Sequence, residues 1–574
     1  MRYTIRTTLL LLYINGIFLF NAVGQQYGAV VINELMIDPS PQVGLPNAEW
    51  VELKNMGASA VNLQGWKIGD ATGISGPMPS FSLLPDSFVI ICSSGNVANL
   101  SSYGKTISVT SFPSLDNDAD LIYIKAANGL SVHAINYKLS YYRNPVKKDG
   151  GWSLEMIDPS YYCAGENNWQ ASIASIGGSP GRKNSCAENR IELSYPKLIR
   201  SFVNDSSTLT LFFDQSVDSL TASKFVNYQL SGGYLITNVS VKPPLFQEIT
   251  LKLNQPLLKD SIIQINVRNI TDCKGNAASI AQTVKAGLCS EALPGDWVIN
   301  EVLFNPYSGG YDFVEFYNNS SKCLNAEKIF LGGRNTTGSI NGLIALKNYP
   351  YTIFPGEYIV VTENATNLSL YYITGKKENI FELPSLPSMP DDEGDILTMS
   401  TSGITLDELH YKDDWHYKLL GNSEGVSLER INPNSKTQDA SNWQSSAASI
   451  GFATPGYKNS QLMERTIESS AINVNPTVFS PDFDGIDDVA IISYNLNNTN
   501  YSAKLSVYSQ DGTPVKLIAN HETVGASGQW KWDGLSEKGI AVPVGIYIIA
   551  GEFYSTTGAV IPVKLPVILA RKKH

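Results

Sequence analysis

The sequence predicts an all-β protein built from several sandwich domains, and three observations lead to this fold class. The chain has 574 residues, more than a single hydrophobic core holds, so about three to five domains are expected. Short runs that alternate apolar and polar residues, such as 50–54, indicate strands. Clusters of Gly, Pro, Asn and Asp separate these runs, and the sequence lacks the capped 3.6-residue period of a long helix, which favours β-sandwiches.

The first 24 residues have the pattern of a secretory signal peptide. Arg2 and Arg6 precede an apolar run at 9–20, and small residues at 22–24 offer a cleavage site before Gln25. No other stretch of the sequence approaches the ~18 apolar residues that a membrane-spanning helix needs. We therefore expect a mature chain without a transmembrane span, secreted or held at the outer cell surface.

Composition argues against nucleic acid as a partner. The chain has 42 Lys and Arg against 53 Asp and Glu, which gives a net charge of −11. Nucleic-acid binding through counterion release needs a basic face, and the longest basic cluster is the tip at 571–573. DNA and RNA are thus excluded as main ligands.

The most informative feature is an internal duplication, in which residues 27–186 (the first repeat) return as residues 296–460 (the second repeat). The matching segments keep their order: VINEL at 31–35 with VINEV at 298–302, EWVELKN at 49–55 with DFVEFYN at 312–318, SLE at 153–155 with SLE at 427–429, and PGRKNS at 180–185 with PGYKNS at 455–460. This order predicts two homologous domains.

The duplicated motifs resemble the bacterial lamin tail domain, and the resemblance covers both repeats. That family has an immunoglobulin-like sandwich fold, so the resemblance implies tandem immunoglobulin-like β-sandwich domains. The second repeat departs from the pattern at 312–313, where Asp-Phe replaces the Glu-Trp of the first repeat.

Residues 190–290 (the middle segment) are predicted to form a further β domain. An apolar run at 209–213 leads into DQSVD at 214–218, and the segment closes on TDCKGN at 271–276. This pattern is similar to that of bacterial Ig-like domains, which usually act as spacers.

Residues 466–574 (the C-terminal segment) follow a polar linker. The segment opens with FSPDFDGIDD at 479–488 and continues through WDG at 532–534 to PVGIY at 543–547. It resembles the Ig-like domain of flagellar hook-capping proteins and the gliding-motility-associated C-terminal domains. The second resemblance implies sorting through type IX secretion, which makes the secretion machinery an expected partner.

The candidate metal ligands are Asp482, Asp484, Asp487 and Asp488. A Ca²⁺ ion takes about 6 to 8 oxygen ligands, and an Asp-x-Asp-Gly turn supplies two carboxylates on one side. The alternative is an Asp-rich turn whose side chains accept backbone N–H bonds. Ca²⁺ is the candidate cofactor for this loop.

Glu34 with Glu52, and Glu301 with Glu315, are predicted to meet across adjacent strands. Paired carboxylates are the apparatus of a glycosidase or of a cation site. Because tandem catalytic dyads in one chain would be unusual, we expect a structural role in which these side chains hydrogen-bond loops. No catalytic residue is predicted, since the sequence lacks the Gly-x-Ser-x-Gly, His-Glu-x-x-His and P-loop motifs.

A histidine pair gives a second hypothesis for a metal site. His410 and His416 flank two aspartates with a spacing that suits zinc in a hairpin. The first repeat has Asn136 and Tyr142 at the corresponding positions, which favours a surface hairpin instead.

Tyrosine pairs give a hint of ligand binding. Such pairs stack on sugar rings or anchor a protein partner when they are exposed, and they pack at sandwich edges when they are half-buried. Packing is the preferred interpretation, because the pairs do not share matching positions in the two repeats. The pairs are Tyr141-Tyr142, Tyr161-Tyr162 and Tyr371-Tyr372.

Six cysteines are sparse for this length, and none forms the Cys-x-x-Cys pair that nucleates a zinc site. We predict disulfides that close local loops, Cys163 with Cys186 and Cys273 with Cys289. Cys92, at the end of an apolar run, is predicted to be a buried thiol.

Together these features predict a secreted or cell-surface, non-catalytic protein of the bacterial envelope, working in adhesion, tethering or structure. Its expected ligand is an envelope protein or polysaccharide. The alternative is a surface hydrolase or the carbohydrate-binding accessory subunit of one, which a deep polar cleft with convergent carboxylates would indicate. A third hypothesis is an inert spacer.

Overall fold

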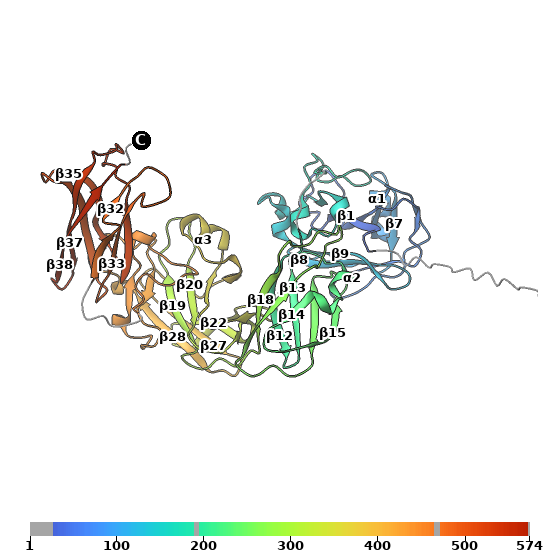
Figure 1. Ribbon diagram of the computed structural model, residues 1–574. Helices are drawn as coiled ribbons and strands as arrows, with labels where there is room; N and C mark the ends of the chain where they lie inside the picture. Colours follow the sequence, from blue (N-terminus) through green and yellow to red (C-terminus); the bar gives the residue numbers. More distant parts are fainter. Residues whose placement is uncertain (1–26, 189–194, 464–470, 572–574) are drawn as a thin grey trace, which may run out of the picture. The chain divides into compact units, whose positions relative to one another are not determined.

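The computed structural model describes residues 27–188, 195–463 and 471–571, and this part of the chain is almost entirely β-structure (Figure 1). The predicted signal peptide lies outside the described residues. The α-helices of the described chain are short: α1 (Val97–Leu100), α2 (Ser219–Ala222) and α3 (Ala365–Tyr371). Within the described residues no helix is long and apolar enough to cross a membrane. The all-β prediction is therefore confirmed.

The chain divides into two compact units, which we describe separately. The first contains the first repeat and most of the middle segment, and the second contains the second repeat and the C-terminal segment.

The first repeat is a six-stranded sheet in the order β11-β10-β1-β2-β6-β7, together with a three-stranded sheet in the order β4-β8-β9 and the small pair β3-β5. One hydrophobic core cluster joins side chains from both larger sheets. The strands are β1 (Val30–Met36), β2 (Trp50–Asn55), β3 (Val61–Asn62), β4 (Lys67–Gly69), β5 (Ser82–Leu83), β6 (Phe88–Ser93), β7 (Thr106–Val109), β8 (Ala119–Lys125), β9 (Ser131–Lys138), β10 (Leu154–Met156) and β11 (Trp169–Ala171).

The second repeat has a six-stranded sheet in the order β30-β29-β19-β20-β25-β26, a four-stranded sheet in the order β23-β22-β27-β28 and the pair β21-β24. The strands are β19 (Trp297–Leu303), β20 (Phe313–Asn318), β21 (Leu324–Asn325), β22 (Ile329–Arg334), β23 (Ile340–Ala345), β24 (Thr352–Ile353), β25 (Tyr358–Thr362), β26 (Ile380–Glu382), β27 (Glu393–Ser400), β28 (Thr405–Lys412), β29 (Leu428–Arg430) and β30 (Trp443–Ser445).

The two six-stranded sheets match strand for strand. Both end in a parallel pair, β6 with β7 in the first repeat and β25 with β26 in the second. Both also have an irregularity in register one residue before a glutamate, between Ile32 and Glu34 and between Ile299 and Glu301. The duplication read in the sequence thus extends to topology and register.

The middle and C-terminal segments each have two sheets. The middle segment has the orders β12-β13-β16-β15 and β14-β17-β18, and the C-terminal segment has the orders β31-β33-β36 and β32-β38-β37-β34-β35. The strands are β12 (Leu198–Asp205), β13 (Thr208–Phe213), β14 (Tyr228–Leu230), β15 (Ile236–Val241), β16 (Glu248–Leu253), β17 (Ile262–Val267), β18 (Gln282–Gly287), β31 (Ala471–Asn475), β32 (Val478–Phe479), β33 (Ala490–Asn495), β34 (Tyr501–Ser509), β35 (Pro514–Thr523), β36 (Ser527–Trp532), β37 (Gly545–Ser555) and β38 (Val560–Leu569).

The central strands of the repeats are buried on both faces, which the alternating pattern of β2 does not suggest. Val51 and Leu53 belong to the main core, yet Trp50 and Glu52 on the opposite face are also fully buried. Trp50 packs in a second apolar cluster with Ile90 and neighbouring side chains. Loops cover this face, so polar residues that read as exposed are in fact interior.

Both predicted disulfides are wrong. The structure instead joins Cys163 to Cys273, which are 110 residues apart and lie in the first repeat and the middle segment. Cys186 is instead buried beside Glu155, and the backbone N–H of Cys186 donates a hydrogen bond to the Glu155 carboxylate. Cys92 is a buried thiol, as predicted.

Candidate functional site

Each repeat carries a row of three buried glutamates on adjacent strands. In the first repeat, Glu34 on β1 lies opposite Glu52 on β2 and opposite Glu155 on β10. All three side chains are fully buried. The predicted meeting of Glu34 with Glu52 is confirmed, and Glu155 extends the pair to a row.

A loop after β11 closes over the first row and supplies most of its hydrogen-bond donors. This loop contains the Pro-Gly-x-x-Asn motif of the repeat, so the motif and the row form one structure. The donors are Ser153 Oγ to Glu34 (2.6 Å), Ser179 N to Glu34 (2.7 Å), Asn33 Nδ2 to Glu52 (2.9 Å), Gly181 N to Glu52 (2.5 Å), Ser179 Oγ to Glu155 (2.7 Å), Ser185 Oγ to Glu155 (2.8 Å) and Cys186 N to Glu155 (2.9 Å).

The second repeat reproduces this arrangement with Glu301, Glu315 and Glu429. Glu301 lies opposite both of the others, and all three side chains are buried. The donors are Ser427 Oγ to Glu301 (2.5 Å), Thr454 N to Glu301 (2.8 Å), Asn300 Nδ2 to Glu315 (2.7 Å), Gly456 N to Glu315 (2.6 Å), Ser446 Oγ to Glu429 (2.6 Å), Ser460 Oγ to Glu429 (2.8 Å) and Gln461 N to Glu429 (2.8 Å).

Burial raises the pKa of four carboxyls in the two rows, and neighbouring carboxylates add to the effect; these are Glu34, Glu52, Glu301 and Glu315. The pKa of Glu52 and that of Glu301 rise to about 8, and those of Glu34 and Glu315 rise well above the ordinary range. Burial raises the pKa of Glu429 as well. A protonated carboxyl can donate one hydrogen bond and still accept others, which suits a crowded row.

Raising the pH from 6.5 to 8 should therefore lower the free energy of unfolding. Above about pH 4.5 the folded glutamates hold protons that the unfolded chain releases, so their contribution to stability falls until the pH reaches the folded pKa. Burial lowers the pKa of His133 and that of His416 to about 4. These histidines make stability rise with pH, but only up to about pH 6.5, where the histidines of the unfolded chain also lose their protons. We expect a loss of about 1–2 kcal/mol for each row in denaturant titrations.

The variants Glu52→Gln and Glu301→Gln provide the control for this prediction. Each amide replaces a carboxyl with a group that cannot ionise, so the pH dependence of its own repeat should flatten. Glu188→Gln, at an exposed position, should leave the pH dependence of stability unchanged. An unchanged slope in both row variants would show that the rows do not titrate in this range.

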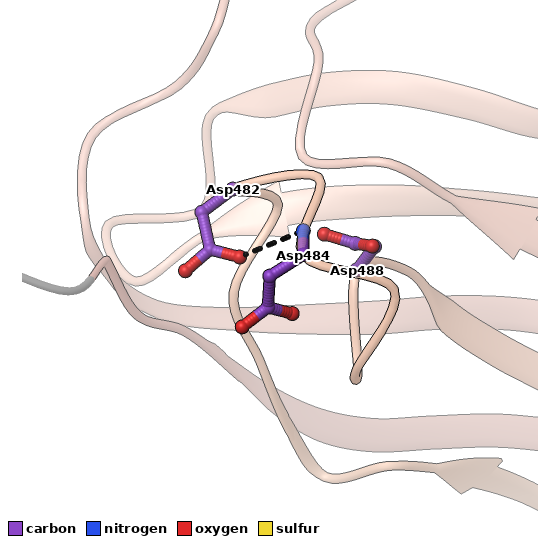
Figure 2. A group of neighbouring side chains, drawn as sticks. All are labelled: Asp482, Asp484 and Asp488. Atoms are coloured by element: carbon purple, nitrogen blue, oxygen red, sulfur yellow. Dashed lines mark hydrogen bonds between the residues drawn. The ribbon is translucent and has the colours of Figure 1, made fainter.

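The acidic loop before β33 brings together three of the four predicted metal ligands. Carboxylate oxygens of Asp482, Asp484 and Asp488 lie within 4.8 Å of one another, and Figure 2 shows the three side chains around one tight loop. The fourth, Asp487, lies outside this group: it is exposed, has a φ of 53°, and its backbone carbonyl accepts a bond from Ser480 N.

Both interpretations of this loop have support in its hydrogen bonds. Asp488 accepts bonds from Phe483 N (2.6 Å) and Gly485 N (2.8 Å), and Asp482 accepts a longer one from Asp484 N (3.4 Å) (Figure 2). These are the bonds of an Asp-rich turn. They also hold the carboxylates at one place, where each oxygen retains lone pairs for a hard cation.

The histidine pair does not form a zinc site. His410 is part-exposed, with Nδ1 2.9 Å from Asp395 and Nε2 3.6 Å from Glu393. His416 is buried against Phe304, and its Nδ1 hydrogen-bonds Ser445 at 2.9 Å. The only group of potential metal ligands found among the described residues is the aspartate group of the acidic loop.

The tyrosine pairs mostly pack. Tyr142, Tyr161 and Tyr372 are buried, and Tyr371 is exposed at 41%. Tyr162 is half-buried and lines a cleft of about 400 Å³ in the first unit, beside Tyr27 and the disulfide. The other lining side chains come from the middle segment and include Phe246, Asp218 and Asp272.

A family model matches part of the first repeat. Residues 24–138 match the family model of the lamin tail domain. No curated protein matches the chain.

Solved structures with similar segments are remote. The N-terminal part of the bacterial S-layer protein SbsC matches at 12% identity and a TM-score of 0.16, covering 38% of this chain and 44% of that one. A Ca²⁺-stabilised adhesin of an Antarctic bacterium matches at 9% identity and a TM-score of 0.12, covering 95% of this chain and 100% of that one. A glucan-utilisation protein of Bacteroides ovatus, SGBP-B, matches at 11% identity and a TM-score of 0.16, covering 89% of this chain and 92% of that one.

The chain spans 44% to 55% of the S-layer structures that it matches. At such low identities and TM-scores the likeness carries no argument about the function of this chain.

Proposed function

We propose that the chain is an exported, non-catalytic component of the bacterial envelope that works in tethering or adhesion. The observation that carries this proposal is the Cys163–Cys273 disulfide, which joins the first repeat to the middle segment. Disulfides form and persist in oxidising compartments outside the cytosol. A covalent bond between consecutive sandwiches also prevents their separation under load, as a tether requires.

The glutamate rows support a non-catalytic role. A glycosidase needs two carboxyls that flank an open site with room for substrate and water. Here the carboxyls are fully buried and bonded to the closing loops, and the same row occurs in both repeats. The geometry suits a clamp that holds β1, β2 and β10, or their counterparts, to the loop that closes the sandwich.

Export and surface location are tested by protease treatment of intact cells. We expect the treatment to release peptides of this chain, and N-terminal sequencing of the native protein to begin at or near Gln25. A cytosolic chain that still begins at Met1 would contradict export.

A second candidate function is ligand binding in the cleft of the first unit, as in a carbohydrate-binding accessory subunit of a hydrolase. The cleft combines the aromatic rings of Tyr27, Tyr162 and Phe246 with the carboxylate of Asp218. Aromatic rings and carboxylates together suit a sugar, whose C–H faces stack and whose hydroxyls donate. Envelope polysaccharide is the probe for this site.

Calorimetric titration with envelope polysaccharide separates the two candidates. The ligand-binding role requires saturable binding that Phe246→Ala weakens and that Phe225→Ala, at an exposed position of the same segment, does not. Absence of saturable binding would leave the tethering role alone.

We further propose that the acidic loop binds Ca²⁺ with an affinity of about 10⁻⁴–10⁻³ M, which is typical of extracellular modules. Millimolar Ca²⁺ should then stabilise the folded C-terminal segment by about 1 kcal/mol and raise its melting temperature by several degrees. Asp484→Asn should abolish the shift, and Asp487→Asn, which lies outside the group, should keep it. Equal melting temperatures of the wild type with Ca²⁺ and with a chelator would favour the plain turn.

The polar linker suggests that the C-terminal segment is independent of the second repeat, but the structure shows direct hydrogen bonds between them within the second unit. Two of the bonded residues, Ser460 and Gln461, also hold Glu429. The bonds are Ala526 N to Ser460 O (3.0 Å), Gln461 Nε2 to Val524 O (3.3 Å), Ala448 N to Thr523 Oγ1 (3.3 Å) and Ser502 Oγ to Tyr417 Oη (3.2 Å).

We propose that the C-terminal segment directs the chain to the surface through the secretion machinery. A chain truncated at about residue 465 should then accumulate in the periplasm. Because truncation also removes contacts of the second repeat, formation of the Cys163–Cys273 disulfide serves as the control for a folded first unit. Surface delivery of the truncated chain at the full-length level would contradict the sorting role.

A further inference from the structure

Cys289 and Cys323 form a direct pair in the backbone of the second unit. Cys289 lies between β18 and β19, Cys323 lies between β20 and β21, and the two residues are partners in an isolated parallel β-bridge. A hydrogen bond from Ser290 N to Cys323 O (2.8 Å) adjoins the bridge. Both cysteines are thiols in the structure.

The bridge places the two side chains where a disulfide can form. Paired strands lie about 4.7–4.9 Å apart, and bridge partners present their side chains on the same face. A disulfide needs a Cα–Cα distance of about 4.4–6.8 Å, so the backbone need not move far.

The positions of the sulfur atoms agree with this geometry. A Cβ atom built on Gly287 would lie 2.5 Å from Cys323 Sγ, so this sulfur points at the stretch that contains Cys289. Cys289 Sγ in turn lies 3.7 Å from Thr352 Oγ1 on β24, the strand that pairs with β21 next to Cys323. Cys323 Sγ therefore lies against the stretch that carries Cys289, and glycine at 287 leaves room for this sulfur.

We propose that Cys289 and Cys323 form a second disulfide in the exported protein. The two thiols lose two protons and two electrons to a disulfide oxidant, either a Cys-x-x-Cys oxidoreductase or a small-molecule disulfide, which is reduced to the dithiol. Burial raises the pKa of Cys289 to about 11, so its folded thiol ionises little, and Cys323 is buried away from an oxidant. Oxidation therefore takes place during folding, before this stretch packs.

This bond would tie the chain that enters the second repeat to the body of that repeat. Proximity in the sequence predicts a bond between Cys289 and Cys273, but in the structure Cys273 is bonded to Cys163. With both bonds formed, the first repeat is covalently joined to the middle segment, and the stretch that leaves the middle segment is covalently joined to the second repeat. The inference rests on backbone pairing and does not depend on the tethering role.

Thiol counting tests the proposal on the full-length chain refolded in a mixture of reduced and oxidised glutathione. Of six cysteines, four are thiols if only Cys163–Cys273 forms, and two are thiols if both bonds form. We expect two thiols in denaturant, and a cross-linked peptide that contains positions 289 and 323. Four thiols, or a bond from Cys289 to any other cysteine, would overturn the proposal.

Single substitutions provide the matched control. Cys289→Ser removes one cysteine but releases Cys323, so the number of thiols should rise from two to three. Cys92→Ala removes a buried thiol outside any bond, so the number should fall from two to one. Because the count is made in denaturant, it holds even for a variant that is poorly folded. A fall after Cys289→Ser would show that position 289 carries a thiol in the wild type.

Discussion

Replacing Glu155 with alanine is expected to lower the free energy of unfolding of the first repeat by about 3 kcal/mol or more. The carboxylate of Glu155 accepts bonds from Ser179 Oγ, Ser185 Oγ and Cys186 N. Its removal leaves these donors buried without their acceptor and opens a cavity between β10 and the closing loop. The loop should detach before the sheet unfolds.

Hydrogen exchange in increasing denaturant measures this effect repeat by repeat in the full-length chain. Peptides from β1, β10 and the closing loop should lose protection in Glu155→Ala, and peptides of the second unit should not change. Glu429→Ala should produce the same loss in the second repeat, where Thr454 Oγ1, Ser460 Oγ and Gln461 N donate the corresponding bonds to Glu429. Glu188→Ala, at an exposed position, should stay within about 0.5 kcal/mol of the wild type. Equal protection in the Glu155 and Glu188 variants would remove the structural role of the row.

Loss of the Cys163–Cys273 disulfide is expected to lower the stability of the first unit by about 4–5 kcal/mol. The bond closes a loop of 110 residues, and in the chain-entropy model a loop of this size contributes that much through the unfolded state. The cysteines also lie beside other contacts between the two segments, such as Tyr161 Oη to Asp272 (2.8 Å). These contacts should weaken when the covalent bond is absent.

Denaturant titration of the double variant Cys163→Ala/Cys273→Ala tests the size of this effect. The midpoint of the first unit, followed by hydrogen exchange of its peptides, should match that of the wild type in dithiothreitol and should not respond further to the reductant. A wild-type midpoint that is unchanged by complete reduction would show that the bond does not stabilise the unit.

Much of the fold could be predicted from the sequence because the same motifs occur in both repeats. Recurrence of the Val-Ile-Asn-Glu motif indicated two homologous domains, and Glu34 and Glu52 were expected to meet across adjacent strands. Glu155 was missed because β10 returns beside β1 from more than 100 residues away, and local patterns do not show which distant strand closes a sheet. The Ser-Leu-Glu segment shared by both repeats was the available signal.

The cysteine pairing could not be predicted for a related reason. Sequence proximity favours short loops, whereas the structure joins residues from two different segments. In the acidic loop, the residue types identified the candidate ligands, but Asp487 has a positive φ and its carboxylate lies outside the group. Backbone conformation in a turn is set by the whole loop, which composition does not describe.

The measurement that tests the central claim most directly is a peptide map, without reduction, of the chain released from the surface of intact cells. The proposed role as an exported and covalently joined tether predicts that both repeats are recovered in the released fraction, with Cys163 cross-linked to Cys273. A chain found only inside the cell, with both of these cysteines as thiols, would contradict it.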